Sequence, residues 1–252
     1  MISKFIKKGG YLSPIIVPFY VFSFFLYFSL YLLGFNVKDN TLVYLITICS
    51  DLLFLFLICK YSHKDYVLKI FKDKFKYSDI FYILLGLPLS FFSSCLYQNI
   101  VKHFGITNVA SPMTPNFNIA YVILAILIAP IFEEFLCRGY VYDSKIGKLS
   151  PFVGITLSTF VFMAMHMTIY HLVVGFFLGI YLGYLRYRTD NLRLPILTHM
   201  TINILSLVIM YNYSYFIKFY QYFDVISICL LPFIVLVIYF KLNLEFFKQL
   251  KK

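Results

Sequence analysis

Residues 121–142 read YVILAILIAPIFEEFLCRGYVY, an apolar run that is long enough to cross a bilayer as one helix. The charged residues inside this run are Glu133, Glu134 and Arg138. An ionisable side chain costs several kcal/mol at bilayer depth, so a membrane helix that keeps such residues is expected to use them. This stretch therefore predicts a membrane protein with polar chemistry placed inside the bilayer.

Composition extends this prediction to the whole chain. Hydrophobic residues make up 61% of the 252 residues and charged residues 13%, which excludes an ordinary soluble domain. We predict an all-α polytopic membrane protein, a bundle of about eight transmembrane helices in one integral membrane domain over residues 1–252. The first apolar run is too long for a signal-peptide core and is expected to be a retained helix. The expected spans are approximately 14–34, 41–59, 79–101, 121–142, 152–168, 170–185, 194–213 and 222–240.

The distribution of basic residues predicts the orientation of these helices. The formal net charge is +11, yet of the 22 Lys and Arg residues only Lys38, Lys102 and Lys218 lie on one set of alternate loops. The opposite side holds the rest, including the loop after the sixth span with Arg186, Arg188 and Arg193. By the positive-inside rule, the protein is a multi-pass cell-membrane protein with both termini in the cytoplasm. Topology and contact with anionic lipid headgroups explain the charge, and no nucleic-acid partner is expected.

Three features inside the predicted spans concern packing. Gly175, Gly179 and Gly183 are four residues apart, so one helix face allows close approach of a neighbouring helix. We expect this face to pack within the monomer, with a dimer interface as the alternative. Asp51 is an isolated acid that is expected to face the bundle interior, with a role in a relay as the alternative. Pro130 removes a backbone hydrogen bond, which predicts a kink just before the two glutamates.

The spacing of charges in the fourth span distinguishes the two glutamates. Glu134 and Arg138 are four residues apart, so they share a helix face and can pair, which offsets much of the cost of burying either charge. Glu133 points about 100° away around the helix and lacks this neighbour, which suits a general base. The alternative is that all three charges lie at the cytosolic interface and extend into water.

Two pairs of residues on later predicted helices add further polar side chains inside the apolar spans. His166 follows Phe162 by four residues on one face of the fifth span. His199 and Asn203 have the same spacing, so both can point into one cavity and donate hydrogen bonds to a developing oxyanion. Each pair alone is readily explained by packing. In combination with the glutamates they favour hydrolysis within the bilayer.

These residues resemble the motifs of a known protease family. The chain is similar to the CAAX-processing and bacteriocin-processing membrane proteases, which are called the CPBP, Abi or Rce1-like family. The resemblance covers about Pro130 to Leu205, and we place the catalytic core at residues 117–213. The first three helices match only in being hydrophobic. The matching motifs, in family order, are EExxxR (Glu133, Glu134, Arg138), FxxxH (Phe162, His166) and HxxxN (His199, Asn203).

The resemblance implies a role for each motif residue. Glu133 and His166 would activate the attacking water, while His199 and Asn203 would stabilise the tetrahedral oxyanion. The supporting residues that orient the site would be Glu134 and Arg138.

Helix length limits how Glu133 and His166 can share a water. If the fourth helix ended near Arg138, His166 would lie roughly 20 Å deeper in the membrane than Glu133, at 1.5 Å per residue. We therefore expect the fourth helix to continue to about Tyr142. His171 follows His166 by five residues and belongs to no family motif, so it is not included among the predicted site residues.

A zinc-dependent mechanism is the alternative to a glutamate-type one. Glu133, His166 and His199 are enough ligands for Zn²⁺ with an open position. The chain has no HExxH motif, and asparagine is a poor zinc ligand. The resemblance favours a mechanism with no obligatory metal or other cofactor, and no metal ligand is assigned.

We predict that the protein is an intramembrane endopeptidase, a hydrolase that cleaves a short peptide or the tail of a membrane-associated protein near the cytosolic leaflet. The chain is rich in Lys, Ile, Phe and Tyr, which is typical of AT-rich bacterial genomes and favours peptide maturation or bacteriocin self-immunity over prenyl-protein processing. One alternative is a catalytically idle membrane scaffold or sensor-binding regulator. Another is a transporter with Glu133 and Asp51 in a relay, which the lack of paired discontinuous helices disfavours. No oligomeric state is predicted.

Overall fold

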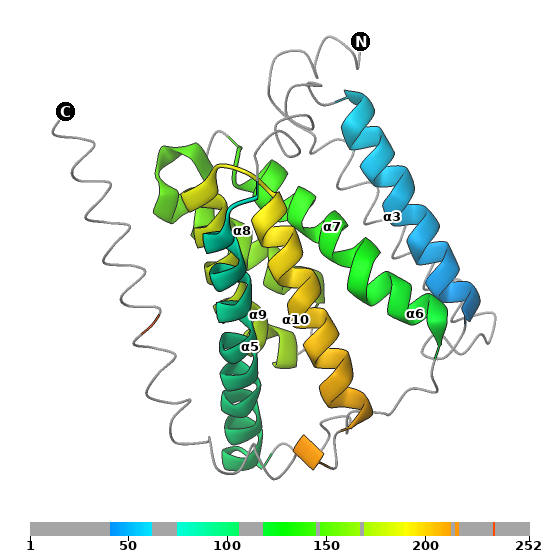
Figure 1. Cartoon of the computed structure of the whole chain (residues 1–252), viewed down its shortest axis with the longest axis vertical. Coiled ribbons are helices and arrows are strands. Elements are labelled where there is room, and N and C mark those ends of the chain that lie inside the picture. The colour runs from blue at the N-terminus through cyan, green and yellow to red at the C-terminus, as the bar shows by residue number, and fades with distance from the viewer. Residues whose placement is uncertain are drawn as a thin grey trace, which may run out of the picture. The chain divides into compact units, whose positions relative to one another are not determined.

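The computed structural model describes residues 41–61, 75–105, 118–144, 147–166, 169–212, 215–216 and 234. Within these residues the regular structure is helical and includes no strand, which confirms the predicted all-α class. Figure 1 shows the helices, which are α3 (Thr41–Tyr61), α5 (Tyr77–His103), α6 (Ile119–Ile123), the π-helix η1 (Leu124–Ile128), α7 (Ala129–Glu134), the π-helix η2 (Phe135–Val141), the 3₁₀-helix η3 (Gly147–Leu149), α8 (Pro151–His166), α9 (Ile169–Thr189) and α10 (Arg193–Tyr211).

Several of these helices are suited to a membrane. Tyr77–His103, Ile119–Val141, Ile169–Thr189 and Arg193–Tyr211 make up the 4 helices that are long and apolar enough to cross one, among the described residues. Shorter apolar helices occupy Thr41–Phe56 and Pro151–His166. All of them agree within about a turn with the predicted spans from 41–59 to 194–213. The predicted spans 14–34 and 222–240 lie outside the described residues, apart from residue 234, so the number of about eight spans stays a prediction.

Packing divides the chain into two compact units. The first unit comprises Met1–Asp73 and Pro115–Phe135, and its described helices are α3, α6, η1 and α7. The second unit comprises Lys74–Thr114 and Leu136–Lys252, with α5, most of η2, η3, α8, α9 and α10. The single integral membrane domain over 1–252 and the catalytic core over 117–213 stay predictions.

In the first unit, α3 lies along α6, η1 and α7 (Figure 1). The side chain of Asn118 donates a hydrogen bond of 2.9 Å to the hydroxyl of Thr41. Two ring pairs continue the contact, at centroid distances of 5.3 and 5.1 Å: Tyr44 with Tyr121, and Phe54 with Phe132. Residue numbers rise together along both partners, so α3 runs parallel to the helix from α6 to α7. Parallel directions are those expected for the second and fourth of a series of alternating spans.

In the second unit, the glycine face of α9 packs closely against α8. A Cβ atom on Gly179 would lie 2.7 Å from the Cγ2 of Thr159, and one on Gly183 would lie 3.1 Å from a side-chain carbon of Ile155. Gly175 leaves more room, because a Cβ there would be 3.6 Å from the ring of Phe162. The predicted packing of this face within the monomer is therefore confirmed. Residue numbers run in opposite senses on the two helices, so α8 and α9 are antiparallel.

The helix α5 completes the second unit by packing against α9 and α10. A Cβ on Gly86 would lie 2.8 Å from the Cγ2 of Thr198. The backbone of α5 therefore packs directly against a side chain of α10. The hydroxyl of Tyr181 donates to the backbone carbonyl of Tyr82 at 2.5 Å, and joins α9 to α5. The core between these helices is apolar and buried, and includes Leu89, Leu178, Leu182 and Ile202.

Candidate active site

The glutamates of the first motif lie on α7, in the first unit. Glu133 is half-buried, whereas Glu134 is fully buried at 0% exposure. This difference agrees with the prediction that the two carboxylates point in different directions around the helix. Asp51 of α3 is also buried, and lies within electrostatic range of Glu133. The prediction that Asp51 faces the interior is thus confirmed, and its neighbourhood includes an acidic residue of the motif.

Pro130 is accommodated by a wide helical turn. In η1 the helix is π-helical, and the N–H of Ala129 donates to the carbonyl of Leu124, five residues earlier. Pro130 then lies at the start of α7, directly after this wide turn. A second π-helical stretch, η2, carries the helix on to Val141. The predicted extension of the fourth helix to about Tyr142 is therefore confirmed, although its path includes π-helical turns that the sequence pattern did not indicate.

Arg138 is buried in the second unit and joins three helices. Its Nη2 donates to the carbonyl of Gly179 at 3.0 Å, and its guanidinium carbon lies 4.8 Å from the centroid of the Phe162 ring. A guanidinium over an aromatic face is attracted by the electrons of the ring. Arg138 thus connects η2 to α8 and α9. Its predicted pairing with Glu134 and its supporting role stay predictions.

His166 is the last residue of α8, and its ring is oriented by the turn before it. The Nδ1 of His166 lies 3.0 Å from the backbone carbonyl of Phe162, and the two rings are 5.2 Å apart at a tilt of 58°. Because a carbonyl oxygen only accepts, Nδ1 is the nitrogen that carries a hydrogen in this contact. In the tautomer with its hydrogen on Nδ1, the acceptor nitrogen of the ring is Nε2.

His199 lies on α10, and its ring also contacts the ring of Phe162. It is buried at 4% exposure, and its ring is 5.5 Å from that of Phe162 in an edge-on arrangement. The structure therefore brings His166 and His199 to one aromatic ring. Asn203, one turn further along α10, is half-buried. Its orientation toward an oxyanion, and the meeting of Glu133 with His166, stay predictions.

His171 is the residue at this site that the motifs did not indicate. Its ring stacks on that of His166 with a centroid distance of 4.4 Å and an interplanar angle of 21°. His171 also lies within electrostatic range of His199. A spacing of five residues on one continuous helix would put the two side chains on different faces. Here α8 ends at His166 and α9 begins at Ile169, so that the spacing rule does not apply.

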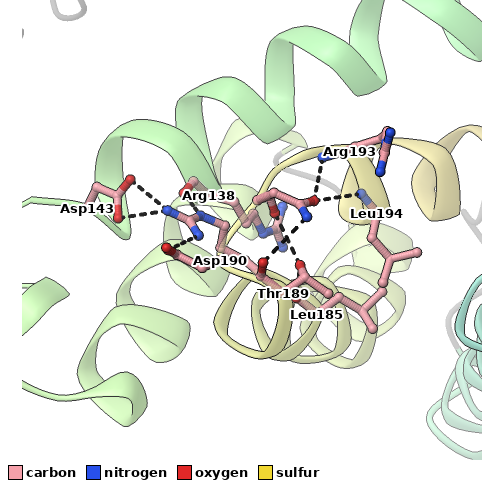
Figure 2. Close-up of polar contacts among 9 residues, drawn as sticks. Arg138, Asp143, Leu185, Thr189, Asp190, Arg193 and Leu194 are labelled. Atoms are coloured by element: carbon pink, nitrogen blue, oxygen red, sulfur yellow. Dashed lines mark hydrogen bonds and ion pairs between the residues drawn. The ribbon is translucent and has the colours of Figure 1, made fainter. Parts of the chain in front are cut away.

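Arg186 corrects one prediction made from charge. It was expected in a cytosolic loop, but α9 continues to Thr189 and the Arg186 side chain is only 6% exposed. Its guanidinium donates to the carboxylates of Asp143 at 2.9 Å and Asp190 at 2.8 Å, and to the carbonyl of Arg138 at 3.2 Å (Figure 2). Nearby acidic residues could have revealed this, because a buried arginine needs such partners.

The turn after α9 is stabilised by side-chain hydrogen bonds (Figure 2). Asp190 has a φ angle of 51°, the left-handed conformation that aspartate tolerates better than most residues. The side-chain oxygen of Asn191 accepts from the backbone N–H groups of Arg193 and Leu194, at 3.1 and 3.4 Å. This capping fixes the start of α10, the helix that carries His199.

The residues described do not by themselves form a zinc site. Among the described part of the chain, no group of three His, Cys, Asp or Glu side chains is arranged to hold a metal ion. Of the candidate ligands, only His166 and His199 belong to the second unit, whereas Glu133 belongs to the first.

Comparison with known families gives the context for this geometry. Residues 115–205 match the family described as type II CAAX prenyl endopeptidase Rce1-like. This segment is similar to the Rce1-like endopeptidases. It contains every motif residue from Glu133 to Asn203, so the resemblance drawn from the motifs is confirmed. The Rce1-like match implies a protease, that is, a hydrolase, and with the apolar helices it points to a membrane protein. Comparison with curated proteins and with solved structures found no match.

Proposed function

We propose that the protein is an intramembrane endopeptidase that cleaves a peptide bond near the cytosolic leaflet. The observation that carries this proposal is the Rce1-like match over residues 115–205, which includes all three motifs. The second unit supports it, because two motif histidines on different helices contact the ring of Phe162. Packing alone does not explain why polar imidazoles are gathered at an apolar ring in a membrane protein.

In this proposal Glu133 and His166 activate the attacking water. The water oxygen bonds to the carbonyl carbon of the substrate while one of these groups accepts the proton. The hydrogen bond between Nδ1 of His166 and the Phe162 carbonyl supports this role, because it leaves Nε2 as the basic nitrogen. No metal ion is required, and none is proposed.

The negative charge that develops on the substrate oxygen would be stabilised by His199 and Asn203. Both are on α10, one turn apart, and hydrogen-bond donors act more strongly in a low-dielectric site than in water. The tetrahedral intermediate then collapses: the bond between carbon and nitrogen breaks, and the amine leaves with the proton that was taken from water. Glu134 and Arg138 would orient this machinery.

The substrate class follows from the membrane setting and the family. We propose a short peptide or the C-terminal tail of a membrane-associated protein, with the basic cytosolic face of the protein in contact with anionic lipid headgroups. The family description names CAAX prenyl endopeptidases, so a prenylated tail is one candidate. A peptide precursor or a bacteriocin without a prenyl group is the other.

Cleavage assays with purified protein in lipid nanodiscs test this proposal. Three fluorogenic peptides should separate the candidate substrates: two ending in CAAX that are identical except for a farnesyl group on the cysteine, and a bacteriocin-leader peptide with no CAAX end. Wild-type protein should cleave at least one peptide. Glu133→Gln, His166→Ala and His199→Ala should each lower the rate by about two to four orders of magnitude with unchanged thermal unfolding. The matched control is His103→Ala, since His103 is an exposed histidine at the end of α5, and it should cleave normally.

Two results would count against the proposal. Normal cleavage by Glu133→Gln would remove the proposed water-activating role of that residue. A folded wild-type protein that cleaves none of the three peptides would instead favour the catalytically idle scaffold.

A further inference from the structure

A continuous series of aromatic rings crosses the second unit. It begins at His199 on α10, passes through Phe162 and His166 on α8, and ends at α5. The successive centroid distances are 5.5, 5.2, 4.4, 5.1 and 5.1 Å. We call this series the ring chain, and its members are His199, Phe162, His166, His171, Tyr170 and Tyr97.

His166 lies in the middle of the ring chain and is held on two sides. The hydrogen bond from Nδ1 to the Phe162 carbonyl fixes one edge of the imidazole. This hydrogen bond restrains rotation about the last side-chain torsion, which is broad for histidine, but does not by itself fix the plane of the ring. The ring of His171, nearly parallel at 21° and 4.4 Å away, restricts that rotation. Together the two contacts define both the direction and the plane of the His166 ring.

His171 is itself anchored to the rest of the unit. It is half-buried, and the ring of Tyr170 meets it edge-on at an angle of 87°. The hydroxyl of Tyr170 lies 3.1 Å from the hydroxyl of Ser94 on α5, and its ring meets Tyr97 at 5.1 Å. The support behind His171 thus extends from α9 to α5. A side chain supported in this way can act as a fixed surface for the His166 imidazole.

We propose that His171 is a positioning residue of the peptidase site, which holds the His166 imidazole in its working plane by ring stacking. This inference rests on the proposed function, and adds to it a residue outside the three motifs. His171 does not need to exchange a proton for this role, since a flat ring of similar size would serve.

A matched pair of variants separates stacking from simple filling of space. His171→Leu keeps an apolar side chain but removes the ring, whereas His171→Phe keeps a ring but removes the nitrogen atoms. Because small misplacements of reacting groups cost up to about 100-fold in rate, we expect His171→Leu to lower kcat about tenfold or more with KM nearly unchanged. His171→Phe should remain within about threefold of wild type. Equal kcat values for the two variants, whether normal or low, would overturn the proposal.

A spectroscopic measurement tests the same proposal without any cleavage. In protein labelled with ¹⁵N-histidine, the His166 signal (assigned with His166→Ala) should report a single tautomer, with the proton on Nδ1, in wild type and in His171→Phe. In His171→Leu the signal should shift toward a mixture of tautomers. An unchanged His166 signal in His171→Leu would refute the positioning role. A wild-type protein with the expected spectra but no peptidase activity would contradict the proposed function and leave the positioning role standing.

Discussion

Phe162 connects several residues of the site in the second unit. Its ring contacts His166 and His199 and lies beneath the guanidinium of Arg138, while its carbonyl oxygen accepts from His166. This explains in physical terms why an aromatic residue stands four positions before the histidine. An aliphatic side chain would fill the space but offer no electron-rich face to the arginine.

At the same scale, Asn203 distinguishes an oxyanion site from a zinc site. If Asn203 donates to the oxyanion, Asn203→Ala should lower kcat by about 100-fold with little change in KM. The loss should be the same after treatment with a strong chelator. The measurement is steady-state cleavage with and without chelator, compared with wild type. A chelator-sensitive wild type that Zn²⁺ restores, together with an active Asn203→Ala variant, would show that zinc is the electrophile.

Arg186 provides a second residue-scale prediction, on stability. Its planar guanidinium donates to two carboxylates and a backbone carbonyl at once, which the single amine of lysine cannot reproduce. Arg186→Lys should therefore lower the free energy of unfolding by about 2 kcal/mol, seen as a lower thermal midpoint in detergent. The control is Arg188→Lys, because Arg188 is exposed and should change the midpoint little. Equal thermal midpoints for the two variants would mean that the buried contacts of Arg186 do not contribute to the free energy of unfolding.

At the scale of helices, the α8–α9 pair shows how closely two elements approach when glycine removes the side chain. At Gly179 the backbone of α9 packs against Thr159, and the carbonyl oxygen of the same glycine accepts a hydrogen bond from Arg138. Helix packing and the support of the motif arginine therefore depend on one position. Gly175, one turn earlier, has ordinary contact distances.

This difference predicts opposite outcomes for the same substitution at two positions. Gly179→Ala places a methyl group where 2.7 Å separates it from Thr159, and should cost about 1–3 kcal/mol in stability. Gly175→Ala should be neutral or stabilising, because alanine favours helix and has room. Adding Thr159→Ser to Gly179→Ala removes the opposing methyl and should restore part of the loss. Thermal midpoints of the four proteins test this, and a harmless Gly179→Ala would contradict the close packing.

The same scale shows what the sequence could predict and what it could not. Apolar runs located the six described helical spans within about a turn, because the bilayer requires a length of roughly 20 residues. The contact between His166 and His171 could not be predicted, since the two residues lie on different helices, α8 and α9, and the contact depends on how these pack. Arg186 was misplaced because a charge at the end of an apolar run is normally outside the membrane helix. The motif residues of the second unit that do meet, Phe162, His166 and His199, were predicted as one constellation.

For the whole molecule, helix directions within each unit agree with alternate crossing of the membrane. The α3 helix is parallel to the helix from α6 to α7 in the first unit, and α8 is antiparallel to α9 in the second. The orientation inferred from basic residues stays a prediction, because these relative directions are the same whichever side faces the cytoplasm. The number of spans and the cytoplasmic termini stay predictions.

Reporter fusions test the orientation directly. A reporter fused after Lys76 or Lys148 should give a cytoplasmic signal, and one fused after Lys102 should give an outside signal, because basic loops are retained in the cytoplasm. Reversed signals at any two fusion sites would contradict the topology and the proposed cytosolic access of substrate.

The π-helix η1, which lies before the two glutamates, affects how the sequences of related chains should be aligned. A turn closed across five residues holds one residue more than the α-helical turn that it replaces. Loss of one residue within Leu124–Ile128 would therefore return the turn to α-helical geometry and keep the flanking segments in register. Homologues that are one residue shorter before the glutamate pair are expected to have their gap here, inside a membrane helix, and not in the preceding loop. An alignment that forbids gaps within helices would shift EExxxR by one position and would wrongly report the motif as lost.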